Sequence, residues 1–161
     1  MRKTDLLEVV LQSLLTHKQR SEYVLGQTHR AIDESPGPSQ SHSDTTRFQT
    51  TEVVKEMAKA AEGQSKTIAI LGYFKTDPAL SRHSEAIELG ALARVDFGGI
   101  VEDYFVLPDG AGTSVEFENV EVCVVTPASP LGQSLLGKRM GDEFDFVANN
   151  RSTRIKVLEI F

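Results

Sequence analysis

The sequence predicts an α+β protein in which an antiparallel α-helical coiled-coil hairpin precedes a small, mostly antiparallel β-sheet domain with one short helix. Three observations predict it. Two long helical patterns flank a Pro-Gly-Pro segment, the hydrophobic period shifts towards two after Glu85, and one short stretch carries a complete set of helix start and stop signals. Long helices followed by consecutive strands are typical of the α+β class.

Each helical arm carries a narrow apolar seam with polar residues in its middle. Residues recur at steps of three and four, as in a coiled coil. In the first arm these are Leu7, Leu11, Leu14, Lys18, Ser21, Leu25, Thr28 and Ile32, and in the second Val54, Met57, Ala61, Gln64, Ile68 and Leu71. The first arm is expected from about 1 to 32, and the second from about 40 to 75.

The arms reverse direction at Pro36-Gly-Pro38, because a proline lacks the amide donor that a helix interior requires. This reversal predicts a hairpin tip at about 33–44, with Asp33, Glu34 and Asp44 around it. The three acids have two interpretations. Asp44 or Ser43 can cap the second helix while the others remain solvated, or the three carboxylates can contribute to a metal site.

The sheet domain is expected to begin after Thr76-Asp-Pro78, because the residue before a proline is pushed out of the helical region. The predicted domains are therefore 1–78 and 82–161, with a short linker between them. The hairpin is expected to lean on the sheet domain at its base, where Leu71, Tyr73 and Phe74 concentrate. Alternating or apolar runs predict strands at 91–97, 100–107, 120–125, 143–147 and 154–160.

The short helix begins after Ser129, a good N-cap, and Pro130 suits the first helical position. Leu131, Leu135 and Leu136 give the helix an apolar face, and Gly137 ends it. These signals alone are explained by a structural role, in which the helix packs over one end of the sheet.

Composition excludes several classes of function. Residues 1–78 carry 10 Lys and Arg against 10 Asp and Glu, and residues 79–161 carry 7 against 13, which gives the net charge of −6. Neither half has a basic stripe, so direct DNA binding is not expected, whereas an acidic body suits a protein partner with a basic surface. There is no apolar run of about 18 residues, so we expect no membrane association and a cytoplasmic protein. The single cysteine, Cys123, excludes a disulfide framework.

The segment from Val124 to Asp142 resembles the C-terminal domain of the Gre transcript cleavage factors of bacterial RNA polymerase. It contains a hydrophobic strand, Ser129-Pro130, a small helix with paired leucines, Gly137-Lys138, and then Gly141-Asp142 before a strand. The resemblance implies an FKBP-like C-terminal domain, and it implies an N-terminal coiled-coil hairpin as the other half of the architecture.

The resemblance also implies a function. In the family, the globular domain docks beside the secondary channel of the polymerase, and tip carboxylates help to hold the second catalytic Mg²⁺, so that the polymerase cleaves its own backtracked RNA. Such a protein is an accessory factor without an activity or cofactor of its own; it holds Mg²⁺ jointly with the polymerase and meets the RNA 3′ end only in the complex. Ser129, Pro130 and Leu131 correspond to the docking side, although Ala128 stands where some members place an acid.

At the tip this chain departs from the family pattern, so Asp33, Glu34 and Asp44 are candidates by position and chemistry only. One alternative is a protein that occupies the channel and regulates the polymerase without cleavage. Another is an FKBP-type peptidyl-prolyl isomerase, which requires a deep aromatic-lined pocket. A third is an interaction module in which the hairpin is only a spacer. We expect a monomer in each case.

Overall fold

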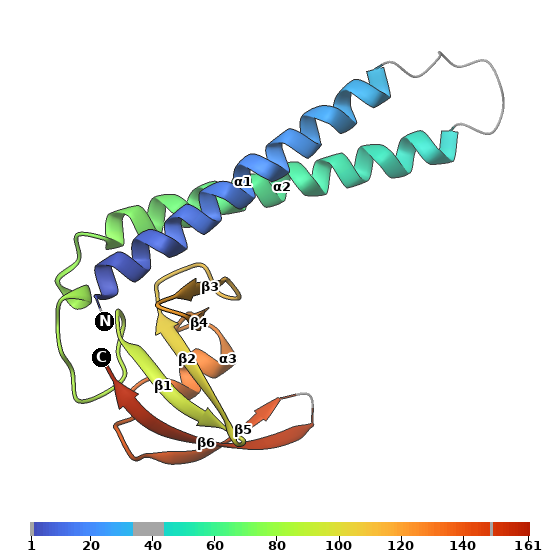
Figure 1. Ribbon diagram of the computed structural model, residues 1–161. Coiled ribbons are helices and arrows are strands. Elements are labelled where there is room, and N and C mark those ends of the chain that lie inside the picture. The colour runs from blue at the N-terminus through green and yellow to red at the C-terminus, as the bar shows by residue number, and fades with distance from the viewer. Residues whose placement is uncertain (1, 34–43, 149) are drawn as a thin grey trace. The chain divides into compact units, whose positions relative to one another are not determined.

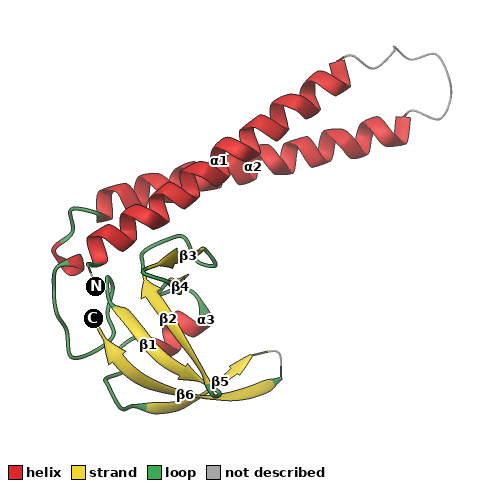
Figure 2. Ribbon diagram, viewed as in Figure 1, coloured by secondary structure: helices red, strands yellow, loops and turns green. Residues whose placement is uncertain are grey.

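Two long helices precede a β-sheet domain in the computed structural model, which describes residues 2–33, 44–148 and 150–161. Helix α1 spans Lys3–Asp33 and α2 spans Asp44–Phe74. A 3₁₀ helix, η1 (Pro78–Leu80), leads into the sheet, and α3 (Pro130–Leu135) lies between its fourth and fifth strands (Figures 1 and 2). The strands are β1 (Leu92–Phe97), β2 (Ile100–Val106), β3 (Ser114–Phe117), β4 (Val120–Val125), β5 (Glu143–Ala148) and β6 (Arg151–Ile160). The predicted α+β class is confirmed.

The helical seams follow the predicted spacing. Leu7 and Leu71 are fully buried, and Leu14 and Val54 are also buried. The polar seam positions described between them, such as Lys18 and Gln64, are half-buried, whereas most intervening positions are exposed. Polar seam residues weaken a coiled coil but help to specify its register. Because the middle of the seam is polar, the buried apolar residues concentrate towards the start of α1 and the end of α2.

At the end of α2, two of the three side chains expected to pack at the base of the hairpin are buried, and the third is not. Leu71 and Phe74 are buried, but the side chain of Tyr73 is 84% exposed. Two residues advance a helix by about 200°, so Tyr73 cannot share the face of Leu71. After the helix, the Asp77 carboxylate accepts a hydrogen bond of 2.8 Å from the Ala79 amide and thereby caps η1.

The sheet has the strand order β3-β4-β2-β1-β6-β5 within the described residues. Strands β2 and β4 run parallel, with Asp103 opposite Val122 and Val106 opposite Val125. The other four pairings are antiparallel, so the sheet is mixed. The Gly98-Gly99 turn between β1 and β2 has positive φ angles of 64° and 96°, which glycine adopts without steric cost.

Strand β3 was not expected from the sequence. It pairs with β4 across a two-residue turn in which Glu118 and Asn119 have φ angles of 51° and 64°. Positive φ at both central residues is the geometry of a type I′ turn, which usually carries Asn-Gly or Asp-Gly. The turn could not be predicted from the sequence, because its first central residue is a glutamate and not Asn or Asp. The strand is also short, with only four residues.

The sheet buries side chains on both faces. One face contributes Ala93, Val95, Tyr104 and Val106 to a core cluster that also contains Leu135 of α3. Alternation places Leu92, Phe105 and Val122 on the other face, where they are also fully buried. The start of α1 and the end of α2, which also carry buried apolar side chains, belong to the same compact unit as the sheet.

The chain divides into two compact units. One unit comprises Met1–Ser13 together with Ala69–Phe161, and the other comprises Leu14–Ile68. The first unit thus contains the sheet domain and the adjoining ends of both helices. Inside it, the Lys3 ammonium donates a hydrogen bond of 2.7 Å to the Arg82 backbone oxygen, and Lys75 pairs with Glu8.

Candidate functional site

The turn that leads into α3 is built around the Ser129 side chain. Its hydroxyl accepts a hydrogen bond of 3.1 Å from the Gly132 amide and donates one of 2.8 Å to the Thr126 backbone oxygen. The Ser129 amide also donates to the Thr126 oxygen, at 3.0 Å. Ser129 therefore caps α3 and at the same time fixes the end of the preceding strand, as the sequence signals predict.

Gly132 is required by a close backbone approach. A Cβ atom at this position would lie 2.0 Å from the Thr126 backbone oxygen and 2.8 Å from its carbonyl carbon. That separation is far below van der Waals contact, so any side chain would displace α3 from the end of β4. No local sequence pattern indicates that the backbone of residue 132 approaches the Thr126 carbonyl, so the need for glycine at this position is visible only in the structure.

The outer side of the turn presents a small surface. Pro130, at the first helical position, and Ala128 are exposed, whereas Leu131 is half-buried against the core cluster. The Gln133 side-chain amide donates a hydrogen bond of 3.3 Å to the Ala128 backbone oxygen. Among the three predicted docking residues, Pro130 is thus the one available to a partner, while Ser129 and Leu131 hold the turn in shape. We call Ala128, Pro130 and Gln133 the α3 surface.

Two of the three predicted tip residues are helix ends that flank the segment outside the described residues. Asp33 is the last residue of α1, and Asp44 is the first residue of α2. Glu34 and the side chains of Asp33 and Asp44 lie outside the described residues. A carboxylate in the first turn of α2 is favoured by the helix dipole, so the capping interpretation of Asp44 and the metal interpretation both remain.

Within residues 2–33, 44–148 and 150–161, no described group of three or more His, Cys, Asp or Glu side chains is arranged to hold a metal. Carboxylates are nevertheless suitable donors for Mg²⁺, which takes oxygen ligands and commonly only one or two carboxylates. Asp33, Glu34 and Asp44 therefore remain the candidate ligands for a metal shared with a partner.

An ion pair in which the carboxylate is buried and the guanidinium is partly exposed links β1 and β2, at a place that no sequence signal indicates. Arg94 on β1 donates to both carboxylate oxygens of Asp103 on β2, each at 2.8 Å, and Asp103 is 1% exposed. The hydrogen bonds to Asp103 raise the pKa of the Arg94 guanidinium, and Glu159 adds a contact at 3.3 Å. Burial leaves no space for a substrate at Asp103, so the pair supports the fold.

The aromatic side chains of the sheet also serve packing. Phe105 is fully buried, Tyr104 is 7% exposed, and the Phe97 and Phe146 rings meet edge to face with centroids 6.0 Å apart. Burial raises the pKa of the Tyr104 hydroxyl, and its hydrogen bond to Glu102 raises it further. Phe105 and Tyr104 are thus buried, and Phe97 and Phe146 pack against the core cluster.

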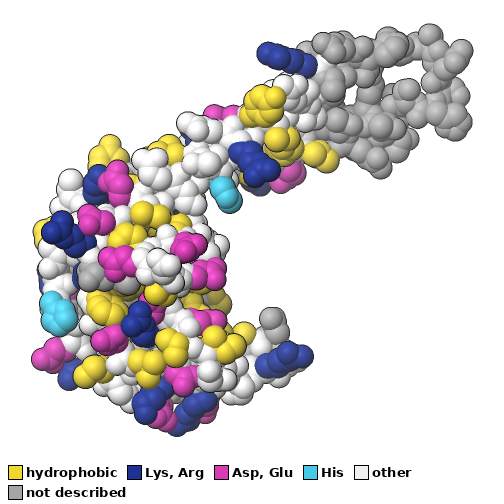
Figure 3. All heavy atoms as spheres, viewed as in Figure 1, with side chains coloured by type: hydrophobic (Ala, Val, Ile, Leu, Met, Phe, Trp, Pro, Cys, Tyr) yellow, Lys and Arg dark blue, Asp and Glu magenta, His cyan; other side chains and the backbone are white. Residues whose placement is uncertain are grey.

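Charged side chains of both signs share the surface of the described residues. On the face drawn in Figure 3, acidic and basic side chains of the described residues are intermixed with apolar ones. In the part of the chain that the structure describes, no helix is sufficiently long and apolar to span a membrane.

The architecture is a helical hairpin followed by a sheet domain. The sheet is mixed, and its short helix α3 begins at the Ser129-Pro130 cap. Residues 112–161 match the family model described as transcription elongation factor, GreA/GreB, C-terminal. The chain thus carries a GreA/GreB C-terminal domain over residues 112–161, which confirms the resemblance at the α3 turn.

Solved structures give a weaker likeness over most of the chain. GreA factor homolog 1 (Gfh1) of Thermus thermophilus is 18% identical with a TM-score of 0.37, covering 94% of each chain. A second Gfh1 structure is 20% identical with a TM-score of 0.38, covering 94% of this chain and 93% of that one. Thermus aquaticus Gfh1 is 18% identical with a TM-score of 0.37, covering 95% and 94%. No sequence among curated proteins matches.

Proposed function

We propose that this chain is a Gre-family transcription elongation factor, that it binds bacterial RNA polymerase at its secondary channel, and that the acids at the hairpin tip assist Mg²⁺-dependent cleavage of backtracked RNA. The observation that carries the proposal is the GreA/GreB C-terminal match over residues 112–161, on a chain whose N-terminal part is two long packed helices. The α3 surface is the proposed docking side.

The proposed division of labour follows from the chemistry of the residues. Pro130 and its neighbours are held rigidly by the Ser129 cap, so a partner meets a preformed surface. Asp33, Glu34 and Asp44 supply oxygen donors that suit Mg²⁺, and an added metal stabilises the attacking or leaving oxygen of a phosphodiester. The polymerase performs the hydrolysis, and this chain completes the metal site.

The test is transcript cleavage in stalled, backtracked elongation complexes supplied with Mg²⁺. The wild-type protein is expected to shorten the RNA from its 3′ end. The triple variant Asp33→Ala, Glu34→Ala, Asp44→Ala is expected to retain polymerase binding and to lose most of the stimulation.

A matched control removes three exposed acids elsewhere, by Glu56→Ala, Glu116→Ala and Glu121→Ala, and should cleave like the wild type. If the wild-type protein binds the polymerase but shortens no RNA, the alternative of channel occupancy without cleavage replaces the cleavage proposal. If it does not bind the polymerase at all, the docking proposal is wrong as well.

A further inference from the structure

A hollow of about 300 Å³ lies within the first compact unit, apart from both the tip and the α3 surface. Arg2, Lys3 and Thr4 line it from the start of α1, and Arg82 and His83 line it from the segment that follows η1. The ring of Phe161, which follows β6, forms a further part of the wall. Segments far apart in the sequence thus bring basic side chains to one place.

None of the described side chains that line this hollow is acidic. Arg2, Lys3 and Arg82 are cationic, and the acidic contact of Arg82 is Glu88, whose carboxylate lies 3.9 Å from the guanidinium with both side chains well exposed. The Lys3 ammonium donates to the neutral Arg82 backbone oxygen. Partial burial lowers the pKa of Lys3, and Glu88 offsets only part of this effect. A desolvated ammonium with an incomplete counter-charge is stabilised by a bound anion.

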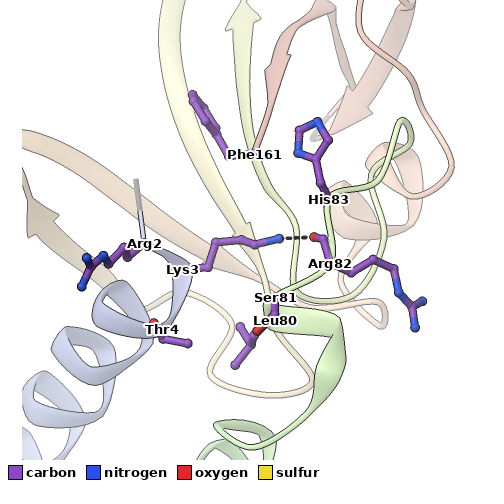
Figure 4. Close-up of a pocket in the computed structure, with 8 residues that line it drawn as sticks. All are labelled: Arg2, Lys3, Thr4, Leu80, Ser81, Arg82, His83 and Phe161. Carbon is purple, nitrogen blue, oxygen red and sulfur yellow. Dashed lines mark hydrogen bonds between the residues drawn. The ribbon is translucent and has the colours of Figure 1, made fainter.

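Of the three cationic side chains, Lys3 is the one that reaches across the hollow in this structure (Figure 4). In Figure 4, Lys3 extends to the Arg82 backbone oxygen, and the His83 and Phe161 rings lie above Lys3 in this view. The guanidinium groups of Arg2 and Arg82 point away to either side. The Arg82 side chain is 62% exposed and can therefore turn inward at little cost. The first turn of the 31-residue helix α1 adds the positive end of its dipole.

We propose that this hollow binds the phosphate group of a small molecule, with the Lys3 ammonium at its centre and the Arg2 and Arg82 guanidinium groups closing over the phosphate oxygens. Arginine is suited to phosphate because its planar fork donates two parallel hydrogen bonds, and the Ser81 and Thr4 hydroxyls add neutral donors at the wall. This site is independent of the proposed function, since it contains neither the tip acids nor the α3 surface.

The test is calorimetric titration of the full chain at constant ionic strength with pyrophosphate, AMP and adenosine. Pyrophosphate or AMP is expected to bind, whereas adenosine, which lacks a phosphate, should not. Binding of both phosphate compounds indicates an organic phosphate monoester site, and binding of pyrophosphate alone indicates an inorganic one. Lys3→Gln is expected to weaken the binding by about tenfold, the effect of losing one charged hydrogen-bond donor.

Two variants separate this site from general charge attraction and from misfolding. Lys66→Gln removes the same charge from an exposed position in the other unit and should bind like the wild type. Lys3→Arg keeps the charge and should retain most of the affinity, and the ligand-free melting temperature of each variant shows whether the fold is intact. Unchanged affinity in Lys3→Gln, equal loss in Lys66→Gln, or equal binding of adenosine and AMP would each overturn the proposal.

Discussion

At the scale of single residues, Gly132 is the position where the backbone tolerates no side chain. The close approach of its backbone to the Thr126 carbonyl predicts that Gly132→Ala destabilises the fold by about 3 kcal/mol or more, because a forced overlap outweighs the helix propensity of alanine. Gly63→Ala is the matched control, since Gly63 lies inside α2 and a Cβ atom there would have nothing within 4 Å. It should stabilise the protein by roughly 0.5–1 kcal/mol. Urea unfolding of both variants measures the difference, and similar effects would contradict the packing at α3.

Tyr104 gives a residue-scale prediction about pH. Its hydroxyl is buried in the core cluster, donates to Glu102 on the same strand and lies beside Cys123 on β4, and its pKa is raised above the ordinary 10.0. The fold therefore favours the neutral phenol. The stability that this contributes is fully present below pH 10 and is lost as the pH rises above the pKa of the unfolded chain.

An ultraviolet titration of tyrosinate absorbance is expected to show a last step above the ordinary tyrosine pKa, and Tyr104→Phe should remove that step. Tyr73→Phe, at a position 84% exposed, should leave it in place. If the last step persists in Tyr104→Phe, the hydroxyl is not protected as described.

At the scale of elements, α3 and its N-terminal turn carry the docking prediction. Pro130→Glu should weaken polymerase binding by about tenfold or more, because it places a charge in the centre of the α3 surface. An acid in the first turn of a helix is favourable to the dipole, so the unfolding free energy should change little. Ser152→Glu, on an exposed position of β6, is the control and should bind normally. Equal binding by the two variants would exclude the α3 surface as the docking side.

The elements also show what a sequence can and cannot reveal here. The helices and α3 are predictable because their signals are local: seam spacing, a proline-containing reversal, and the Ser129-Pro130 start. The short strand β3 is missed because Glu118 occupies a turn position that usually carries Asn or Asp. The Arg94–Asp103 pair depends on the β1–β2 register, and the hollow around Lys3 depends on three segments distant in sequence. Such sites arise from tertiary placement, which no local pattern encodes.

At the scale of the whole molecule, the division into compact units bears on where the chain can be cut. The domain boundary between 78 and 82 stays a prediction from the sequence. The compact unit that contains the sheet domain also contains Met1–Ser13 and α2 from Ala69 onward. The second face of the sheet, with Leu92, Phe105 and Val122 fully buried, requires apolar cover. We infer that the helix ends supply it, because four of their side chains are also fully buried within the same unit: Leu6, Leu7, Val10 and Leu71.

Two shortened chains test this dependence. A fragment of residues 82–161 leaves the second face of the sheet without the helix ends, so it should unfold at a lower urea concentration than the full chain and bind a hydrophobic dye. A chain that joins residues 1–13 to 69–161 through a short glycine-rich linker keeps these side chains, and it should unfold cooperatively and bind little dye. It should still bind RNA polymerase through the α3 surface but stimulate no RNA cleavage, because it lacks the tip. If fragment 82–161 proves as stable as the joined chain, the helix ends do not complete the core of the sheet domain.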